Sequence, residues 1–189
     1  MKVRRFAHVV GFDDAPFERG HRGDVLIVGA VYSGERLDGV LSGRVRRDGA
    51  NATAALTDLI RGSKFAGHLQ AVLLQGIAFA GFNVIDIHGL HAALGLPVLV
   101  VSRKLPNLET IREALIGQVR GGARKWRLIE RAGMMESLRG VYVQRVGLGL
   151  EEAEYLVKRF AVHGRLPEPL RVAHLIAGGV VSGESRHRA

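Results

Sequence analysis

Hydrophobic residues recur along the chain in short runs, and their spacing alternates between strand and helix patterns. Residues 71–106, AVLLQGIAFAGFNVIDIHGLHAALGLPVLVVSRKLP, contain two such runs, at 72–74 and 98–101, on either side of a segment with helical spacing. Runs that are apolar at successive positions are typical of parallel strands covered on both faces. Asn83, with Asp86 three residues later, is expected to cap the intervening helix. The stretch therefore predicts a βαβ unit.

The same patterns predict the remaining elements. Three apolar runs with short links precede the βαβ unit and are typical of an antiparallel meander. After it, apolar positions three and four residues apart indicate amphipathic helices. The basic segment from Arg120 to Arg131, flanked by glycines, is interpreted as an exposed extension. The other expected strands are 6–11, 25–32, 37–46 and 141–144, and the other expected helices begin near residues 52, 108, 151 and 167.

This order of elements predicts a ribonuclease H-like fold: a mixed α/β sheet in which three antiparallel strands adjoin parallel strands, flanked by helices. The length favours one domain spanning residues 1–189. A flavodoxin-like sheet is the structural alternative, but the glycine-rich phosphate loop expected after its first strand is absent from the sequence. In the ribonuclease H-like order the ends of the first and fourth strands are neighbours. Asp13 and Asp14 are therefore expected near Gln75.

Composition narrows the class of protein. The chain has no cysteine, which excludes disulfides and thiolate metal sites, and its apolar runs are shorter than the ~20 residues of a membrane span. The basic N-terminal residues are followed by Asp13 and Asp14 before an apolar stretch long enough for a signal peptide. We therefore expect a soluble, cytoplasmic protein that does not bind membranes. The net charge of +9 favours a polyanionic partner, DNA or RNA. A basic surface of a heat-adapted proteome is the alternative.

Polar residues at predicted strand ends are the candidate site, because chemistry in open α/β sheets gathers at the carboxyl ends of strands. Asp13 and Asp14 follow the first strand, where two adjacent acids indicate a metal or phosphate site. The alternative is an Asx-turn that leads to Pro16. Glycine beside a strand end allows a substrate backbone to come close. The candidate substrate-binding residues are Gly76, Asn83, Arg103, Lys104 and Arg171.

Three segments, beginning at Gly11, Leu73 and Arg165, together resemble one known family, endonuclease V. Gly11-Phe12-Asp13 is similar to the strand end that supplies the family's first metal-binding aspartate. LLQGIAFAGFNVIDIHGLHAALGLPVLVVSRKL is similar to a segment in which an Asp-Gly turn precedes a helix and the next strand, and RLPEPLRVAH resembles the C-terminal region. RRDGANAT, GIAFAGFNVIDI and GES are similar to a bacterial and archaeal branch that shares this fold. Together these matches cover most of the chain.

The resemblance implies a Mg²⁺-dependent phosphodiesterase acting near deaminated purines in DNA or RNA. Asp13 carries over as the first metal ligand, with Asp14 or Asp48 beside it, and His174 lies where a supporting basic residue is expected. Gln75 stands where the family has an aspartate, and an amide brings no charge. The family's catalytic glutamate has no clear match, Asp48 being the nearest acid, and the PYIP-like wedge beside a flipped base is absent.

The sequence leaves three functional interpretations open. The first is a nuclease in which Asp13, Asp14, Gln75 and His174 are catalytic and Asp13, Asp14 and Asp48 hold Mg²⁺. The second is a catalytically inactive nucleic-acid-binding or interaction protein on the same scaffold. The third is a small-molecule enzyme that uses a pocket at residues 76–83, because a fold does not fix a function.

Overall fold

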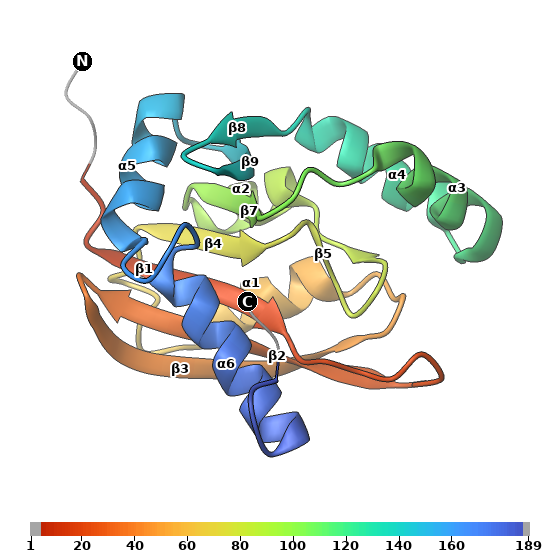
Figure 1. Ribbon diagram of the computed structural model, residues 1–189, viewed down its shortest axis with the longest axis horizontal. Helices are drawn as coiled ribbons and strands as arrows, with labels where there is room; N and C mark the ends of the chain where they lie inside the picture. The colour runs from red at the N-terminus through yellow and green to blue at the C-terminus, as the bar shows by residue number, and fades with distance from the viewer. Residues whose placement is uncertain (1–4, 187–189) are drawn as a thin grey trace.

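The computed structural model describes residues 5–186 and contains a mixed sheet with helices on both faces (Figure 1). The strands are β1 (His8–Asp14), β2 (Asp24–Ser33), β3 (Arg36–Arg46), β4 (Ala71–Gln75), β5 (Ala78–Phe79), β6 (Asn83–Val84), β7 (Val98–Ser102), β8 (Glu136–Leu138) and β9 (Val141–Val146). The helices are α1 (Ala52–Arg61), α2 (Ile87–Leu94), α3 (Leu108–Gln118), α4 (Gly122–Ala132), α5 (Leu150–Phe160) and α6 (Glu168–Ser182).

The main sheet has seven strands in the order β3-β2-β1-β4-β7-β9-β8. Strands β1, β4 and β7 run parallel to one another, whereas β2, β3, β9 and β8 each run antiparallel to their neighbours. Strands β5 and β6 pair separately as a short ribbon. The three-strand meander followed by parallel strands confirms the predicted fold class.

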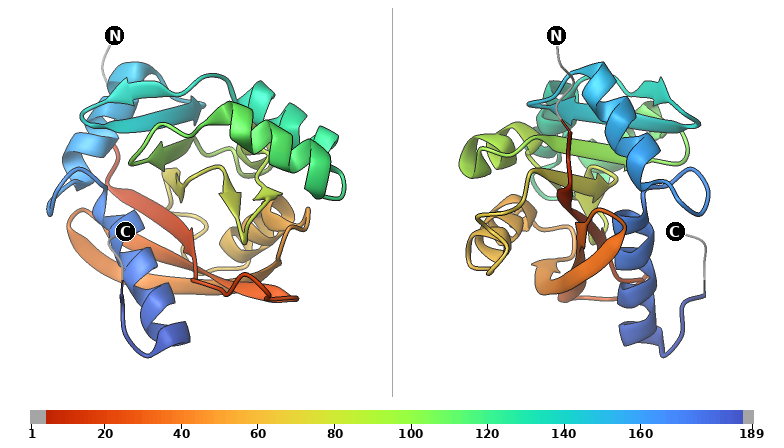
Figure 2. Two further views of the ribbon diagram at one scale, coloured as in Figure 1. Left: turned by 45° about the vertical axis from the view of Figure 1, so that its right-hand side comes forward. Right: turned by 90° about the vertical axis from the view of Figure 1, so that its left-hand side faces the viewer.

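The helices form two layers around this sheet. Helices α5 and α6 lie on one face and α1 and α2 on the other (Figure 2). Helices α3 and α4 pack against each other and extend beyond the sheet from the end of β7. Within the described part of the chain, no helix is long and apolar enough to cross a bilayer.

Helix α6 lies close to β1 because small residues line their contact. Gly11 lies directly under the helix, and a Cβ atom there would stand 2.6 Å from the carbonyl carbon of Pro169. Ala173 and Ala177 are buried on the same helix. Pro169 lies in the first turn of α6, where a backbone N–H would have no partner within the helix, so the missing N–H of proline costs no hydrogen bond there. The result is a helix whose backbone reaches the strand that carries the candidate carboxylates.

Two predicted local structures are wrong. The cap of α2 is Asp86, which accepts a hydrogen bond from the Gly89 N–H at 2.9 Å, and not Asn83, because the β5–β6 ribbon occupies the residues before the helix. The basic segment 120–131 is not an extension, since residues 122–132 form α4. Lys125 and Ile129 are buried on its inner face.

Candidate functional site

The parallel pairing of β1 with β4 brings the candidate residues together. Phe12 pairs with Leu74 in the ladder, so the next residues along the two strands, Asp13 and Gln75, are neighbours at the carboxyl edge. Helix α6 supplies His174, whose Nδ1 lies 2.8 Å from Asp13 Oδ2. Asp13 is only 4% exposed. The topology thus places residues from three distant segments at one point.

The two carboxylates interact directly. Asp13 Oδ1 accepts a hydrogen bond from the Asp14 N–H at 2.9 Å, and Asp14 Oδ2 accepts one from the Ala80 N–H at 2.7 Å. Burial, and then the charge of Asp13, raise the pKa of Asp14 from 3.8 to about 7, against the lowering effect of the Ala80 N–H. Asp14 is therefore mostly protonated at pH values below about 7.

Gln75 is the neighbour of Asp13 in the register of β1 and β4. Its Oε1 is buried and has no hydrogen-bond partner among the described residues. Two carboxylates and an amide oxygen are ligands of the kind that Mg²⁺ accepts, and Mg²⁺ usually keeps several waters besides a few protein ligands. The donor set therefore fits one hard cation, with less charge than a three-carboxylate site would provide.

Asp48 does not join this group. Its Oδ1 accepts a hydrogen bond from the Phe82 N–H at 2.8 Å, its Oδ2 lies 3.4 Å from Arg47 Nε, and its carbonyl accepts a hydrogen bond from Lys125. Within residues 5–186, no cluster of three or more acidic, histidine or cysteine side chains is arranged to hold a metal. The predicted set of Asp13, Asp14 and Asp48 is therefore not assembled, because Asp48 is bonded to the loop after β5.

Asn83 is structural rather than available to a substrate. It is fully buried, and its side-chain oxygen accepts a hydrogen bond from the Ala52 N–H at 3.0 Å. Its side-chain nitrogen donates to the Arg46 carbonyl at 2.8 Å and to Asn51 Oδ1 at 2.7 Å. The side chain thereby joins β3, the start of α1 and the β5–β6 ribbon.

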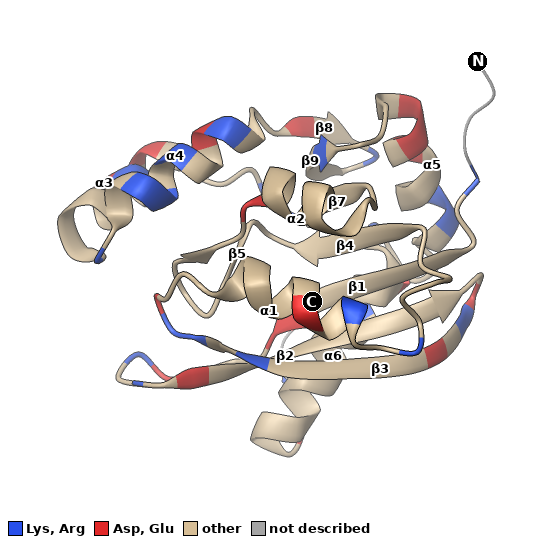
Figure 3. Cartoon of the chain, turned by 180° about the vertical axis from the view of Figure 1, so that it is seen from behind, with Lys and Arg blue, Asp and Glu red and all other residues tan. Residues whose placement is uncertain are grey.

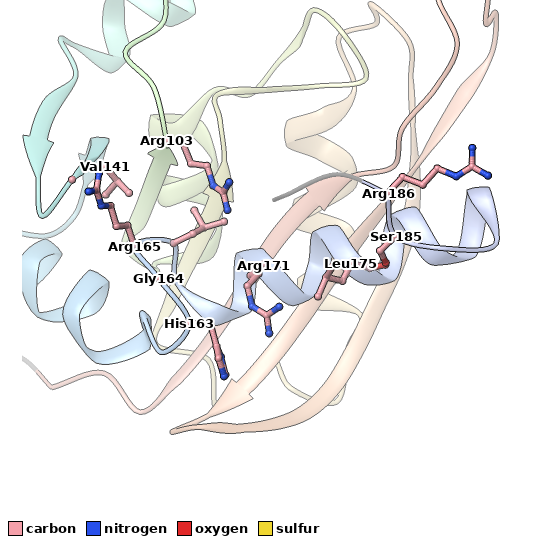
Figure 4. Close-up of a pocket in the computed structure, with 11 residues that line it drawn as sticks. Arg103, Val141, His163, Gly164, Arg165, Arg171, Leu175, Ser185 and Arg186 are labelled. Carbon is pink, nitrogen blue, oxygen red and sulfur yellow. The ribbon is translucent and has the colours of Figure 1, made fainter.

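Two of the predicted basic residues line one cavity. Arg103, beyond the end of β7, and Arg171, on α6, line a cavity of about 750 Å³ together with Arg165 and Arg186 (Figure 4). Arg171 donates two hydrogen bonds of 2.8 Å to Glu168. Burial raises the pKa of Glu168, but the hydrogen bonds from Arg171 and His163 outweigh it and leave that pKa lowered. Arg171 is thus held as an ion pair, whereas Arg103 is exposed.

A second cavity lies beside the site, and residues of the predicted pocket at 76–83 line part of it. It has a volume of about 230 Å³ and is lined by Gly76, Ser102 and Gln144 together with apolar residues. Gly76 follows Gln75 directly and has φ +79, a conformation that favours glycine. Gln144 is 4% exposed. A polar residue within the apolar strand VYVQRV is the sequence feature that could have indicated it. Lys104 is exposed beyond β7 and lines neither cavity.

The ribonuclease H-like fold is shared with solved structures of endonuclease V. A solved structure of Ciona intestinalis endonuclease V, in complex with DNA containing an inosine, aligns with a TM-score of 0.55, 17% identity and coverage of 89% of this chain and 83% of that chain. The family model described as endonuclease dU matches residues 5–181. The chain belongs to this family.

Relatives match over nearly the full chain. A UPF0215 protein of Deinococcus radiodurans is 62% identical over 181 residues, which cover 96% of this chain and 92% of the relative. A crystal structure from Archaeoglobus fulgidus is 32% identical with a TM-score of 0.86, and the alignment covers 92% of this chain and 98% of that one. The Archaeoglobus fulgidus structure therefore has the same fold as this chain.

Proposed function

We propose that this protein is a divalent-cation-dependent endonuclease that hydrolyses a phosphodiester bond of nucleic acid near a deaminated base. The observation that carries the proposal is the buried pair of Asp13 and Asp14 at the end of β1, next in the strand register to Gln75, whose Oε1 has no hydrogen-bond partner among the described residues. The description of the family names an endonuclease and dU, and the Ciona complex contains inosine. Deoxyuridine and inosine are both products of deamination, so both are candidate substrates.

The residues of the site have distinct roles in this reaction. In hydrolysis, a water oxygen bonds to phosphorus, the bond to the bridging oxygen breaks, and that oxygen takes up a proton. A bound Mg²⁺ would supply charge at the phosphoryl oxygens and make its bound water more acidic. Asp13, Asp14 and the Gln75 oxygen would hold the ion, and the proton on Asp14 would leave when it binds. His174 is a positioning residue, because its Nδ1 holds one oxygen of Asp13.

Basic residues near the site support a nucleic-acid partner. Arg103 and Arg165 line the cavity of about 750 Å³ at the end of β7, on the same edge of the sheet as Asp13. Figure 3 shows further Lys and Arg along α4 and along β3. Arginine and lysine contacts to phosphates position a nucleic acid without recognising its bases. We therefore assign Arg103 and Lys104 to the phosphate backbone on either side of the scissile bond.

Cleavage of end-labelled duplexes tests the proposal. The duplexes contain one deoxyuridine, one inosine or no modified base, and each is incubated with Mg²⁺ or with EDTA. The natural protein is compared with Asp13→Ala and Gln75→Asp. Asp58→Ala, which removes an exposed carboxylate of α1, is the matched control. We expect Mg²⁺-dependent cleavage by the natural protein and the control, and none by Asp13→Ala beyond the rate in EDTA.

The outcome for Gln75→Asp is informative in both directions. A third carboxylate adds charge for the cation, so we expect tighter Mg²⁺ binding and faster cleavage at low Mg²⁺. Cleavage that persists undiminished in Asp13→Ala would overturn the proposed centre. Cleavage that is equal in EDTA would overturn the role of the cation.

One observation favours a second function, a nucleic-acid-binding protein without catalysis. The described residues offer no cluster of three acidic, histidine or cysteine ligands, and position 75 carries a neutral amide. In that case the natural protein binds the duplexes with a steep salt dependence, as phosphate contacts require, but leaves them intact. Cleavage that appears only in Gln75→Asp would identify this second function.

A further inference from the structure

Arginines from four segments surround the cavity of about 750 Å³ (Figure 4). They come from beyond the end of β7, from the link between α5 and α6, from α6 itself and from the residues after α6. The polar side chains that line the cavity are those of Arg103, His163, Arg165, Arg171, Ser185 and Arg186. The four proposed catalytic residues do not line it, so this cavity is a different site from the centre at Asp13.

The positive charge of this cavity is only partly neutralised. Glu168 accepts two hydrogen bonds of 2.8 Å from Arg171, and Glu184 lies 2.9 Å from Arg186. Within the part of the chain that the structure describes, Arg103 and Arg165 form no ion pair. Guanidinium groups without an acidic partner attract anions, and their planar fork of N–H groups fits phosphate oxygens especially well.

The turn between β8 and β9 gives Arg165 a defined place in the cavity wall. Gly140 lies in that turn with φ +82, and a Cβ atom built on it would stand 2.7 Å from Arg165 Cδ and 3.1 Å from Arg165 Nε. The arginine therefore packs directly over a glycine, whose missing side chain leaves room for it. A side chain that already packs along a wall has less freedom to lose when a ligand binds.

The shape and the residue types of the cavity favour a compact anion with several phosphates. In Figure 4 the guanidinium groups are spread around the cavity, so a chain of linked phosphates can reach several of them, whereas one orthophosphate cannot. The volume falls within the roughly 300–1,000 Å³ of small-molecule sites. Among the described residues no Phe, Tyr or Trp lines the cavity, so it offers no platform on which the bases of a single strand could stack.

We propose that this cavity binds an oligophosphate, the chemistry shared by nucleoside triphosphates and inorganic tripolyphosphate, through Arg103, Arg165 and Arg171. This binding needs no cation at Asp13 and does not depend on the proposed nuclease activity. Arg103 is also the residue assigned above to the nucleic-acid backbone. A bound oligophosphate takes that contact from the nucleic acid, so an occupied cavity weakens nucleic-acid binding.

Isothermal titration calorimetry of the natural protein, in EDTA and at fixed ionic strength, tests the binding. The probes are tripolyphosphate, ATP, orthophosphate and a single-stranded oligothymidylate. We expect tripolyphosphate and ATP to bind at least about 10-fold more tightly than orthophosphate, because each further hydrogen bond between charged groups adds roughly that factor. Equal affinities for tripolyphosphate and ATP would show that the phosphates alone are recognised, whereas tighter binding of ATP would show that the nucleoside also enters the cavity.

Point variants locate the binding site. Arg103→Gln and Arg165→Gln should each weaken the binding of tripolyphosphate about 10-fold. Arg22→Gln removes the same charge from an exposed position in the loop between β1 and β2, and should leave the affinity unchanged. Asp13→Ala should also leave it unchanged. The oligophosphate site and the proposed nuclease can therefore fail independently of each other.

Displacement of nucleic acid supplies a test with the natural protein alone. Tripolyphosphate should lower the affinity for a fluorescent duplex in EDTA more than sulfate does at the same ionic strength. An affinity for tripolyphosphate no greater than that for orthophosphate, or equal weakening by Arg22→Gln and Arg165→Gln, would overturn the inference. Oligothymidylate that binds more tightly than tripolyphosphate through Arg103 and Arg165 would also overturn it, and would assign the cavity to a strand of nucleic acid.

Discussion

Helix α6 lies on one face of the sheet and the α3–α4 pair extends beyond the end of β7, and the two are held in place very differently. Helix α6 buries Leu170, Ala173 and Ala177 against β1 and β2. Helix α3 buries only Leu115, and its Ile116 is 54% exposed. Local stability follows the amount of buried apolar contact, so α3 and α4 should open at a lower free energy than α6.

This difference bears on the proposed cation site. A carboxylate pair that positions a cation needs fixed geometry, and Asp13 is fixed by α6 through His174. Helices α3 and α4 carry none of the proposed catalytic residues, so they can open without moving the carboxylates. The predictions below change one side of this comparison at a time.

Matched alanine substitutions of two glycines should give the largest contrast. Gly11→Ala places a Cβ atom 2.6 Å from the Pro169 carbonyl carbon and 2.8 Å from the Leu170 nitrogen, and backbone atoms cannot rotate away. We expect a loss of about 3 kcal/mol in the free energy of unfolding. Gly117→Ala in α3 meets nothing within 4 Å and should stabilise by up to about 1 kcal/mol. Urea denaturation measures both, and similar effects would contradict the tight packing of α6.

Asp14→Asn should show the next largest effect, and the effect should depend on pH. The pKa of Asp14 is raised to about 7, mainly by burial, so the folded state keeps a proton that the unfolded state releases near pH 4. The natural protein, free of cations, therefore loses stability as pH rises from about 4 to 7. Asparagine imitates the protonated acid and can still accept from Ala80. The variant should be more stable by roughly 2 kcal/mol at pH 8, with no advantage below pH 4.

Thermal unfolding across this pH range, in EDTA and in Mg²⁺, measures the Asp14 effect. Because the proposed cation replaces the proton on Asp14, Mg²⁺ should stabilise the natural protein more at pH 8 than at pH 5, and should stabilise Asp14→Asn less at both. A natural protein whose stability is flat between pH 4 and 7 would show that the pKa of Asp14 is not raised.

The sequence predicted the parts of this site that follow from the order of strands. The apolar runs that form β1 and β4 place Asp13 beside Gln75 whatever their separation along the chain. Asp48 and Asn83 could not be placed in this way. Asp48 lies in the turn after β3 and Asn83 in β6, and their hydrogen bonds join segments more than 30 residues apart, which residue spacing does not reveal.

Helix α4 and Gln144 show a different limit of the sequence. The buried positions Lys125, Ile129 and Ala132 are spaced as in a helix, but the many arginines between them suggested a solvated segment. Lys125 is buried because its amine donates to the Asp48 carbonyl, and burial lowers its pKa. Gln144 is recognisable in the sequence as a polar residue within a buried strand. Its hydrogen-bond partner, the Gly133 carbonyl, lies in the loop after α4 and could not be identified from the sequence.

Ile129→Val should have a smaller and local effect. Ile129 is 4% exposed in a cluster with Val84 and Leu115 that is separate from the main core. Removing one methylene group should cost about 1 kcal/mol. Hydrogen exchange measured by mass spectrometry should show faster exchange in α3 and α4, with α6 unchanged. Equal acceleration in both would mean that the two regions open as one unit.

The smallest effect is expected at the contact between α3 and α4. The Arg112 guanidinium lies 6.0 Å from the centre of the Trp126 ring, at an exposed position where such contacts contribute about 0.5 kcal/mol. Arg112→Ala should therefore leave global unfolding almost unchanged but raise hydrogen exchange in α3 about twofold. A double-mutant cycle with Trp126→Leu separates this contact from the loss of the arginine itself.

The measurements on Arg112 also show what holds the α3–α4 pair together. A coupling energy near zero in the cycle, with exchange in α3 unchanged, would mean that the buried cluster of Val84, Leu115 and Ile129 holds the two helices without help from the Arg112 contact. A coupling energy of about 0.5 kcal/mol would mean that the exposed face contributes as well. Exchange in α6 is the internal control, because neither result should change it.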